Sequence, residues 1–524
     1  MAPHDSPPPT NRHPGGPFTL REILNRDDLG SAGDVAFTAA TAFSGRVSPG
    51  GLFAGLRGRD LHGAWFWEEA VDRGAAVVLT DEPLPECPVP VAVFTPWRGD
   101  ARQAFGEVCH ALHGRPSERL FVAGVTGTNG KSTVCWLLRS IFREAMRLKN
   151  KPPIAGLCGT IETDDGREIR PSKLTTPACE DLHAWLARCV AHGCEAAAVE
   201  LSSHALDQDR AAGLRLSAAV VTNVTRDHLD YHGSLEAVVR AKASIADLLR
   251  PGKPLITCRD DPEAAEIWWK IERDVVQTQY GFAPEGWDSG SQVGGVMICE
   301  PKYRPEGSTF VLRYAGGRHP LRLSTPLVGR FNVLNATAAA TAAEPCGSDA
   351  VAAGLANVPP VPGRLEPIDR GQPFRVLVDY AHTPDGLRAV IDAVRPLLSS
   401  QKRGGRLHLL VGAGGDRDRG KRAEMGAAAA LADRVVFTSD NPRSEDPHAI
   451  LRDLAAGCPE TRCETIENRR EAIAAALAAA RPGDWVLVCG KGHETTQEVA
   501  GVFHPFDDRV VCREELARLG YGGA

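Results

Sequence analysis

The sequence predicts an α/β protein of three domains, with a mostly parallel sheet in the central one. The chain has 524 residues, enough for about three domains at roughly 150 residues each. Hydrophobic residues make up 43% of it and charged residues 24%, the balance of a soluble globular protein. Short apolar runs alternate with helical patterns along the chain, which is typical of parallel sheets.

Composition also narrows the range of partners. The net charge is -6, so there is no basic excess to bind nucleic acid. No apolar run reaches the roughly 18 residues of a membrane helix, and the start lacks the pattern of a signal peptide. The 14 scattered cysteines indicate reduced thiols rather than disulfides or zinc ligands. We expect a cytoplasmic monomer with no nucleic-acid partner and no membrane insertion.

The N-terminal part begins with a tail rich in Pro, Gly and polar residues, and we predict disorder over residues 1–17. "SPGGLFAGLRGRDLHGAWFWEEAVDRGAAVVLTDE" follows. It reads as an apolar strand, a Gly-rich turn, an amphipathic helix and a second strand. The sequence therefore predicts a small α/β domain over 18–115.

The central domain is expected over 116–360 and the last domain over 361–524. "RLFVAGV", "CEAAAVELSS", "SAAVVTNVT" and "KPLITC" are strand-like, with helical patterns between them. The stretch 277–326 alternates like an antiparallel excursion, and the Pro-rich "NVPPVPGRLEP" indicates a hinge. "FRVLVDYAH", "RLHLLVGAGG", "DRVVFTSD" and "DWVLVCGKG" predict a Rossmann-like C-terminal domain.

A glycine loop, "GVTGTNGKST", runs from Gly124 to Thr133 between a predicted strand and a predicted helix. The backbone N–H groups of such a loop bind phosphate at a helix N-terminus, and a P-loop lysine and hydroxyl reach the phosphates and Mg²⁺. The strict pattern has glycine where Val125 stands, so this is a variant, and a plain strand-to-helix turn is the alternative. We predict a P-loop-type ATPase domain. The expected ATP-binding residues here are Gly127, Thr128, Asn129, Gly130, Lys131, Ser132 and Thr133.

Polar residues follow two other predicted strands. Glu200 ends one of them, where α/β proteins collect site residues, and its carboxylate suits Mg²⁺. A solvated strand-end acid is the alternative for Glu200 alone. The next strand is followed by Asn223, Arg226, Asp227, His228 and Asp230, which together predict a site.

The stretch "FTSDNPRSEDP" raises a separate question, because it presents Asp440, Asn441 and Arg443 just past a predicted buried strand. The Asn-Pro pair favours a turn. A turn stabilised by the Asp and Asn side chains is one interpretation. The other is a binding loop, and the two are compatible.

With these motifs the chain resembles the Mur ligase family of ATP-dependent amino-acid ligases. The resemblance covers nearly the whole chain after the tail. It rests on eleven motifs in family order: "GTNGKST", "TTP", "ELSSHALDQDR", "TNVTRDHLDYHG", "AKASIADLL", "GRFNVLNATAA", "VPGRLE", "VDYAHTPDGL", "GAGGDRDRGKRAEMG", "DNPRSEDP" and "GKGHETTQ".

The resemblance implies amide-bond formation in two steps. ATP phosphorylates the carboxylate of a UDP-N-acetylmuramoyl dipeptide, and the amino group of meso-diaminopimelate then displaces phosphate, which makes a peptidoglycan precursor. Phosphorylation is needed because a free carboxylate resists nucleophiles, and catalysis is then mostly positioning and charge neutralisation. The implied cofactors are ATP, Mg²⁺ and a CO₂-derived carbamate on a lysine.

The resemblance also implies roles for individual residues at the positions that match the family's motifs. The resemblance implies catalytic roles for Lys131, Glu200, His228 and Lys242. It implies a metal site of Ser132, Glu200, His228 and carbamylated Lys242. It adds Asn332 and Arg364 around the nucleotide and Asp379 around domain closure, and leaves His382 open. The implied UDP-substrate contacts are Ser44, Arg59, Asp60, Leu61, Thr175, Thr176, Ser202, Gln208 and Arg210.

The same resemblance answers the question of the "DNPR" loop. Arg443 is expected to bind a carboxylate that diaminopimelate has and lysine lacks. Glu494 is expected to bind the distal ammonium. The full implied set for the amino acid is Arg417, Asp440, Asn441, Pro442, Arg443, Gly490 and Glu494.

One motif departs from the family, and three alternative functions share part of the pattern. "FSGR" has Phe43 and Gly45 where the family has an acid and an arginine, so Arg46 is a candidate substitute. Lysine addition is the rival within the family, and a non-catalytic ATP-binding module is the rival of another class. A folylpolyglutamate-type ligase shares the ATP loop but does not account for "DNPR" or "SSHALDQDR".

Overall fold

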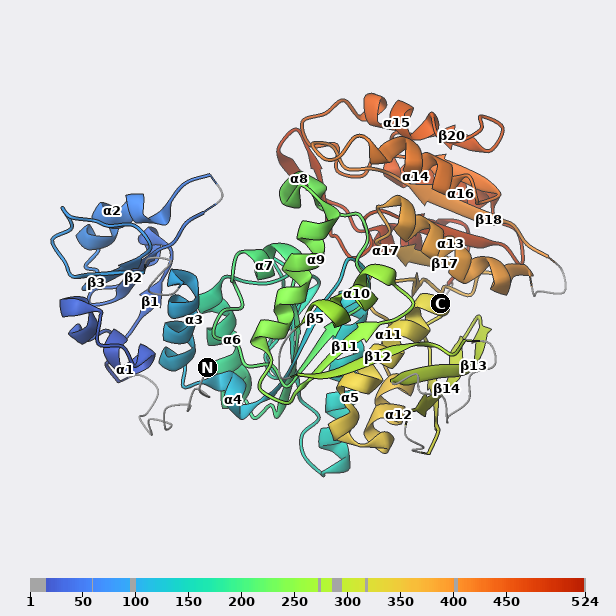
Figure 1. Cartoon of the computed structure of the whole chain (residues 1–524). Coiled ribbons are helices and arrows are strands. Elements are labelled where there is room, and N and C mark those ends of the chain that lie inside the picture. The colour runs from blue at the N-terminus through green and yellow to red at the C-terminus, as the bar shows by residue number, and fades with distance from the viewer. Residues whose placement is uncertain are drawn as a thin grey trace.

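The computed structural model describes residues 16–58, 60–94, 100–271, 275–284, 295–315, 319–399 and 404–522. Almost all of the predicted tail, and Arg59, lie outside the described residues. Three sheets follow one another along the chain and occupy separate parts of the molecule, shown in Figure 1 as blue, green to yellow, and orange to red. The predicted α/β class with mostly parallel sheets is confirmed.

The N-terminal sheet has four parallel strands in the order β1-β2-β3-β4. They are β1 (Ala40–Thr41), β2 (Leu52–Gly55), β3 (Val77–Thr80) and β4 (Val91–Val93). The helices are α1 (Leu20–Leu24), α2 (Trp67–Asp72) and α3 (Ala101–Leu112). α3 packs on α6 of the central part. A Cβ on Gly106 of α3 would lie 2.4 Å from Ala212, so this close approach requires glycine.

The central sheet has eleven strands in the order β15-β14-β13-β12-β11-β10-β5-β9-β6-β7-β8. The run from β13 to β6 is parallel throughout, whereas β7, β8, β14 and β15 pair antiparallel at the two edges. Its strands are β5 (Phe121–Thr126), β6 (Gly156–Cys158), β7 (Glu162–Asp164), β8 (Ile169–Pro171), β9 (Ala196–Glu200), β10 (Ala218–Val221), β11 (Pro254–Cys258), β12 (Val276–Phe282), β13 (Val296–Arg304), β14 (Gly307–Tyr314) and β15 (Leu321–Thr325).

The predicted antiparallel excursion over 277–326 is only partly present. β12 pairs parallel with β11 and β13 pairs parallel with β12, so both belong to the parallel run. Residues 283–295 separate the two strands, which is the length that a parallel crossover needs. Within the described residues of this stretch, only β14 and β15 pair antiparallel, and they extend the main sheet instead of leaving it.

The central helices cover this sheet. They are α4 (Pro116–Arg119), α5 (Lys131–Leu148), α6 (Cys179–Ala191), α7 (Ser203–Asp207), α8 (Leu229–His232), α9 (Leu235–Ala243), α10 (Pro262–Lys270), α11 (Arg330–Ala342) and α12 (Ser348–Ala356). α5 packs on α11 and α12. β5, β9 and β10 are almost completely buried and apolar, as expected of strands covered on both faces.

The C-terminal sheet has the order β16-β17-β21-β18-β19-β20 and is parallel except for β16. Its strands are β16 (Glu366–Pro367), β17 (Arg375–Asp379), β18 (Leu407–Val411), β19 (Arg434–Phe437), β20 (Cys463–Thr465) and β21 (Trp485–Cys489). Its helices are α13 (Pro384–Ser399), α14 (Lys421–Ala429), α15 (Pro447–Ala455), α16 (Arg469–Ala479) and α17 (Asp508–Arg518). A separate hairpin joins β22 (Thr496–Val499) to β23 (Val502–Pro505).

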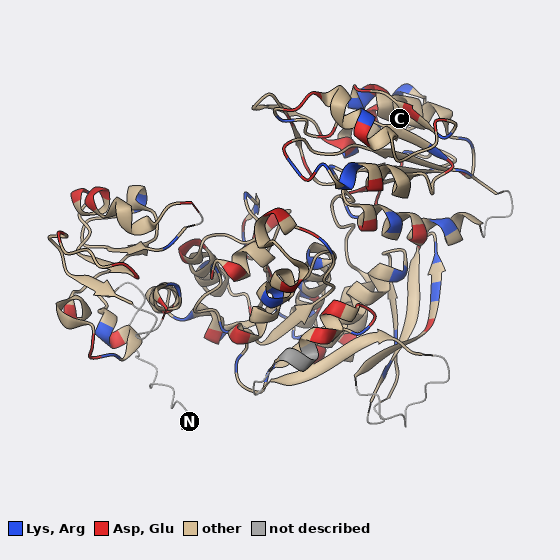
Figure 2. Cartoon of the chain, turned by 45° about the horizontal axis from the view of Figure 1, so that its top comes forward, with Lys and Arg blue, Asp and Glu red and all other residues tan. Residues whose placement is uncertain are grey.

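Three general features concern the surface and the thiols of the protein. Lys and Arg are interspersed with Asp and Glu over all three parts in Figure 2. Among the described residues, no helix combines the length and the apolar character needed to cross a membrane. All 14 cysteines are free thiols, most of them buried.

Candidate active site

The glycine loop joins β5 to α5 and lies against two other elements. Gly127 has φ +144° and Gly130 has φ +88°, which favour glycine. A Cβ on Gly127 would lie 1.9 Å from Thr222 Oγ1, just after β10. A Cβ on Gly130 would lie 2.4 Å from Asn335 Oδ1 on α11. The loop backbone therefore fits this space only with glycine at both positions.

Asn223 fixes the shape of the loop from the end of β10. Its carbonyl accepts from Thr128 N at 2.9 Å, and its side chain pairs with the backbone of Asn129 through bonds of 2.8 and 3.0 Å. No side chain caps the N-terminus of α5. The first N–H groups of this 18-residue helix are thus available to an anion, as a phosphate site requires.

Lys131 is the first residue of α5, and its ammonium is held at the loop. Nζ donates to the carbonyls of Gly127 and Thr128 at 2.8 and 2.9 Å. Burial lowers the pKa of Lys131, while the nearby Glu200 carboxylate opposes that effect. The positive charge of Lys131 therefore lies where the loop would bind a phosphate.

Glu200, at the end of β9, is 1% exposed and forms the acidic side of the loop. Its carboxylate accepts from Ser132 Oγ at 3.1 Å, Thr160 Oγ1 at 2.9 Å and Thr160 N at 3.1 Å. A Cβ on Gly159 would lie 2.1 Å from Glu200 Oε1. A hydroxyl and a carboxylate in contact beside a phosphate loop are an oxygen donor set that fits Mg²⁺.

The other two predicted metal ligands stand apart from this pair. Lys242 on α9 is 2% exposed and its Nζ donates to Thr128 Oγ1 at 2.7 Å, so it reaches the loop. Burial, and then the charge of Lys131, lower its pKa to about 7. His228 is at φ +54° and lies 3.4 Å from Asp227, with its ring against His204. In the part of the chain that the structure describes, no three His, Cys, Asp or Glu side chains form a ready metal cluster.

Arg364 brings the hinge segment to the loop. Its Nη2 lies 3.3 Å from Ser132 Oγ, and its guanidinium stacks on Tyr380 at 4.8 Å from the ring centroid. Asn332 on α11 donates to Val328 O and accepts from Asn335, the residue that lies against Gly130. Both predicted nucleotide contacts are therefore linked to the loop.

A cavity of ≈ 580 Å³ lies between the central and C-terminal parts. α11 of the central part packs on α13 of the C-terminal part, and in Figure 1 α8 projects toward the orange C-terminal segments. The cavity is polar, and eleven of the predicted site residues line it: Thr175, Thr176, Ser202, Arg210, His228, Arg417, Asp440, Asn441, Arg443, Gly490 and Glu494.

On the central side of this cavity, hydrogen bonds order the predicted substrate residues. Thr176 Oγ1 donates to Glu200 O at 2.8 Å, and Thr175 Oγ1 lies 3.0 Å from Thr160 Oγ1. Arg210 donates to Gln208 Oε1 at 2.6 and 2.9 Å. Gln208 does not line the cavity and instead holds Arg210, which does.

On the C-terminal side, the "DNPR" loop is fixed by buried charges. Lys491 is fully buried and donates to Asn441 Oδ1 at 3.2 Å and to Glu494 Oε2 at 3.0 Å. Asn441 Nδ2 donates to Glu494 Oε2 at 2.9 Å. Gly490 has φ +111°, and a Cβ there would lie 2.6 Å from Asp440 Oδ2. Pro442 is the member of the loop that faces another cavity.

The predicted N-terminal contacts are not brought to this cavity. Ser44 donates to Glu69 Oε2 at 2.6 Å, and Leu61 is 55% exposed. Ser44, Asp60 and Leu61 do not line the cavity between the other two parts. Arg46 pairs with Asp181 of α6 at 3.1 Å, so it links the N-terminal part to the central one.

Sequence reasoning missed several residues that line the cavity. The most informative is Lys421, the first residue of α14, for which the described residues offer no hydrogen-bond or ion-pair partner. Burial lowers its pKa, with Asp227 opposing. Its position after "GGDRDRG" was visible as a basic residue opening a helix. The other missed residues are Leu174, His204, Leu229, Tyr380, Thr383, Pro384, Asp385, Gly414, Asp418 and Glu424.

Replacing Lys421 by Met is expected to weaken ligand binding without lowering the thermal stability of the protein. Loss of this half-buried cation should raise KM for an anionic ligand of the cavity by about tenfold, the size of one charge-assisted contact. Because burial penalises that cation, thermal unfolding should shift upward rather than downward. Steady-state kinetics and a melting curve check both. An unchanged KM would remove Lys421 from the site.

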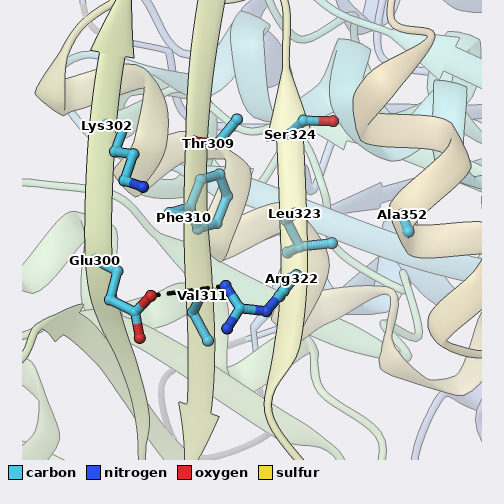
Figure 3. A pocket seen from close by; sticks show the side chains of 9 residues that line it. All are labelled: Glu300, Lys302, Thr309, Phe310, Val311, Arg322, Leu323, Ser324 and Ala352. Atoms are coloured by element: carbon cyan, nitrogen blue, oxygen red, sulfur yellow. Dashed lines mark ion pairs between the residues drawn. The ribbon is translucent and has the colours of Figure 1, made fainter.

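A smaller cavity of ≈ 280 Å³ lies on β13, β14 and β15 beside α12 and is drawn in Figure 3. Glu300 and Arg322 face each other across it at 3.6 Å, and both are largely exposed. Solvent screens such a pair. None of the loop or strand-end residues described above lines this cavity, so it is not part of the candidate site.

Comparison with known proteins agrees with this geometry. The family model "Mur ligase middle domain" matches residues 125–343, and "Mur ligase, glutamate ligase domain" matches residues 363–492. A UDP-N-acetylmuramoyl-L-alanyl-D-glutamate–2,6-diaminopimelate ligase of Streptomyces avermitilis is 40% identical over 92% of this chain and 93% of its own. The protein of that name from Streptomyces coelicolor is 39% identical over 97% of this chain and 99% of its own.

A solved structure with the same protein name superposes with a TM-score of 0.67 at 30% identity, covering 96% of this chain and 100% of the other. The fold and the site define a nucleotide-binding α/β protein with a polar cavity between two of its parts. The chain belongs to the Mur ligase family.

Proposed function

We propose that this protein is an ATP-dependent ligase that adds meso-diaminopimelate to the D-glutamate of UDP-N-acetylmuramoyl-L-alanyl-D-glutamate, as a step of peptidoglycan precursor synthesis. The observation that carries the proposal is the ≈ 580 Å³ cavity, which places Arg417, Arg443 and Glu494 opposite Thr175 and Arg210. The relatives at about 40% identity carry the name of this activity.

Phosphoryl transfer is assigned to the glycine loop. Lys131 and the N-terminus of α5 would bind the transferred phosphate, with Asn332 and Arg364 closing around the nucleotide. Mg²⁺ bound at Ser132 and Glu200 would neutralise the phosphate charge. The remaining proposed ligands are His228 and carbamylated Lys242, which belong to the same central part as Ser132 and Glu200. The proposed closure brings the C-terminal part toward the loop through the hinge at Arg364.

The acceptor is assigned to the C-terminal side of the cavity. Arg443 and Arg417 would bind the carboxylates of diaminopimelate, and Glu494 its distal ammonium. Glu494 Oε2 already accepts from Lys491 and Asn441, so Oε1 is the oxygen left for the ligand. The "DNPR" turn and the binding loop are thus one feature, since the turn is what places Arg443.

The remaining assignments are also proposals. We assign 18–115 to the UDP moiety, 116–360 to ATP and 361–524 to the amino acid, with Ser44, Asp60 and Leu61 as UDP contacts. Arg46 is occupied by Asp181, so it would have to exchange partners to replace the family arginine. A cytoplasmic monomer is the proposed state, in keeping with the free thiols.

Phosphate release from ATP tests the proposal. With the UDP-linked dipeptide present, we expect release that depends on meso-diaminopimelate, with kcat/KM at least about a hundredfold above that for L-lysine because lysine leaves Arg443 unpaired. Omitting the dipeptide is the control. Preference for lysine would keep the ligase and overturn the assignment of Arg443, and no release with either amino acid would favour a non-catalytic module.

A further inference from the structure

The hairpin of β22 and β23 makes a backbone contact with the "DNPR" loop. Arg443 N donates to Glu498 O at 3.1 Å, and Ala500 N donates to Arg443 O at 2.7 Å. This forms an isolated parallel bridge between Arg443 and Val499. The loop that presents Arg443 is therefore paired with the hairpin on one side.

Two further contacts join the same elements. Gln497 Nε2 donates to Asp440 O at 2.7 Å, and Glu498 N donates to Asn441 Oδ1 at 3.0 Å. Consecutive residues of β22 thus hold three of the four "DNPR" residues. A loop carrying this many cross-links moves with the hairpin rather than independently of it.

The guanidinium of Arg443 is itself held on two of its three nitrogens. Nε donates to Glu498 Oε2 at 3.2 Å, and Nη1 donates to Gly415 O. Nη2 has no hydrogen-bond partner among the residues that the structure describes. Arg443 lines the cavity and Glu498 does not. Nη2 of Arg443 is therefore available to a ligand in the cavity that Arg443 lines.

We propose that Glu498 is a positioning residue for amino-acid selection, which fixes Arg443 so that Nη2 is presented to the substrate carboxylate. The inference rests on the proposed function. It assigns a role to a residue outside the cavity, because an arginine side chain loses less freedom on binding when its orientation is already set.

The geometry of the acceptor matters more here than its charge. Both side chains are 24% exposed, so solvent screens the ion pair. The substrate carboxylate must also approach the same guanidinium, and a second carboxylate nearby does not add to its attraction. An uncharged oxygen at this position should therefore support Arg443 nearly as well as a carboxylate.

The test uses phosphate release by the full chain with varied meso-diaminopimelate. Glu498→Ala should raise KM for diaminopimelate about tenfold, the effect of one lost hydrogen bond to a charged group, and should alter kcat by less than about twofold. Glu498→Leu, which fills the volume without an acceptor, should do the same. Glu498→Gln should recover most of the loss. Phe503→Ser, at a 65% exposed position of β23, controls for general damage to the hairpin.

A double-mutant cycle decides whether Glu498 acts through Arg443. In an Arg443→Ala background, Glu498→Ala should add no further increase in KM. Additive losses, a fall in kcat instead of a rise in KM, or no recovery with Gln would overturn the inference. No diaminopimelate-dependent turnover in the unaltered chain would overturn the proposed function instead, so the two failures are distinct.

Discussion

Replacing Lys131 by Met should lower kcat for ATP-dependent ligation by at least about a hundredfold, the usual cost of removing one charge from a preorganised transition-state site. Lys131 Nζ lies at the loop carbonyls of Gly127 and Thr128, where the loop would bind the phosphates. Methionine keeps the length and the helix propensity of lysine and removes only the ammonium. Phosphate release under saturating substrates measures the effect.

Lys149→Met is the matched control, because Lys149 is the C-cap residue of the same helix and its exposed ammonium pairs with Glu195 at 2.9 Å. That variant should keep wild-type turnover. Thermal unfolding shows whether Lys131→Met stays folded, since the variant also loses the two hydrogen bonds that Nζ donates to the loop carbonyls. A Lys131→Met protein with normal kcat would place the phosphate elsewhere.

The order of the elements around the loop could be predicted from the sequence. β5, the glycines and Lys131 follow each other in a few residues, so local pattern defines strand, turn and helix start. Glu200 and Asn223 end buried apolar strands, and strand ends in a parallel sheet meet at one edge. This is why the sequence predicts that Glu200 and Asn223, far from Lys131 in the chain, lie near it, and Glu200 does contact Ser132.

Other features depend on spatial neighbours that no local pattern reveals. The sequence predicts that β14 and β15 leave the main sheet. They extend it instead, because β14 pairs with β13 and so adds to that edge of the sheet. The family resemblance places His228 with Ser132 and Glu200, yet its ring packs on His204. Such packing depends on the position of α8, which the order of residues does not specify.

The C-terminal contacts divide in the same way. Asp440, Asn441 and Arg443 were recognised because a turn follows a buried strand. Lys491 and Glu498 were not, since a lysine and a glutamate some 50 residues further on carry no signal of what they touch. Only the tertiary structure brings the hairpin against the loop, through the bridge of Arg443 and Val499.

Lys242 provides the second large expected effect, because the proposed carbamate is a chemical modification that the fold has to favour. Its pKa of about 7 leaves much of the amine neutral at physiological pH, owing to burial and to Lys131. Carbamylation consumes the neutral amine and releases a proton: R–NH₂ + CO₂ gives R–NH–COO⁻ and H⁺. At a fixed concentration of dissolved CO₂, the carbamylated fraction of Lys242 should therefore fall steeply below pH 7. There the amine is already protonated, so forming one carbamate releases two protons.

Lys242→Arg should lower kcat by at least about a hundredfold, because arginine stays charged and cannot carry the carboxylate that Mg²⁺ would need. The unaltered chain should lose activity below pH 7 in CO₂-depleted buffer, because the neutral fraction of the Lys242 amine falls as that amine is protonated. Adding CO₂ should restore the activity. Lys253→Arg, at an exposed turn, is the control. Carbon-13 NMR after labelling with ¹³CO₂ should show a carbamate signal that Lys242→Arg lacks. If that signal is absent from the unaltered chain with ATP and Mg²⁺ present, Lys242 acts as an amine and not as a carbamate.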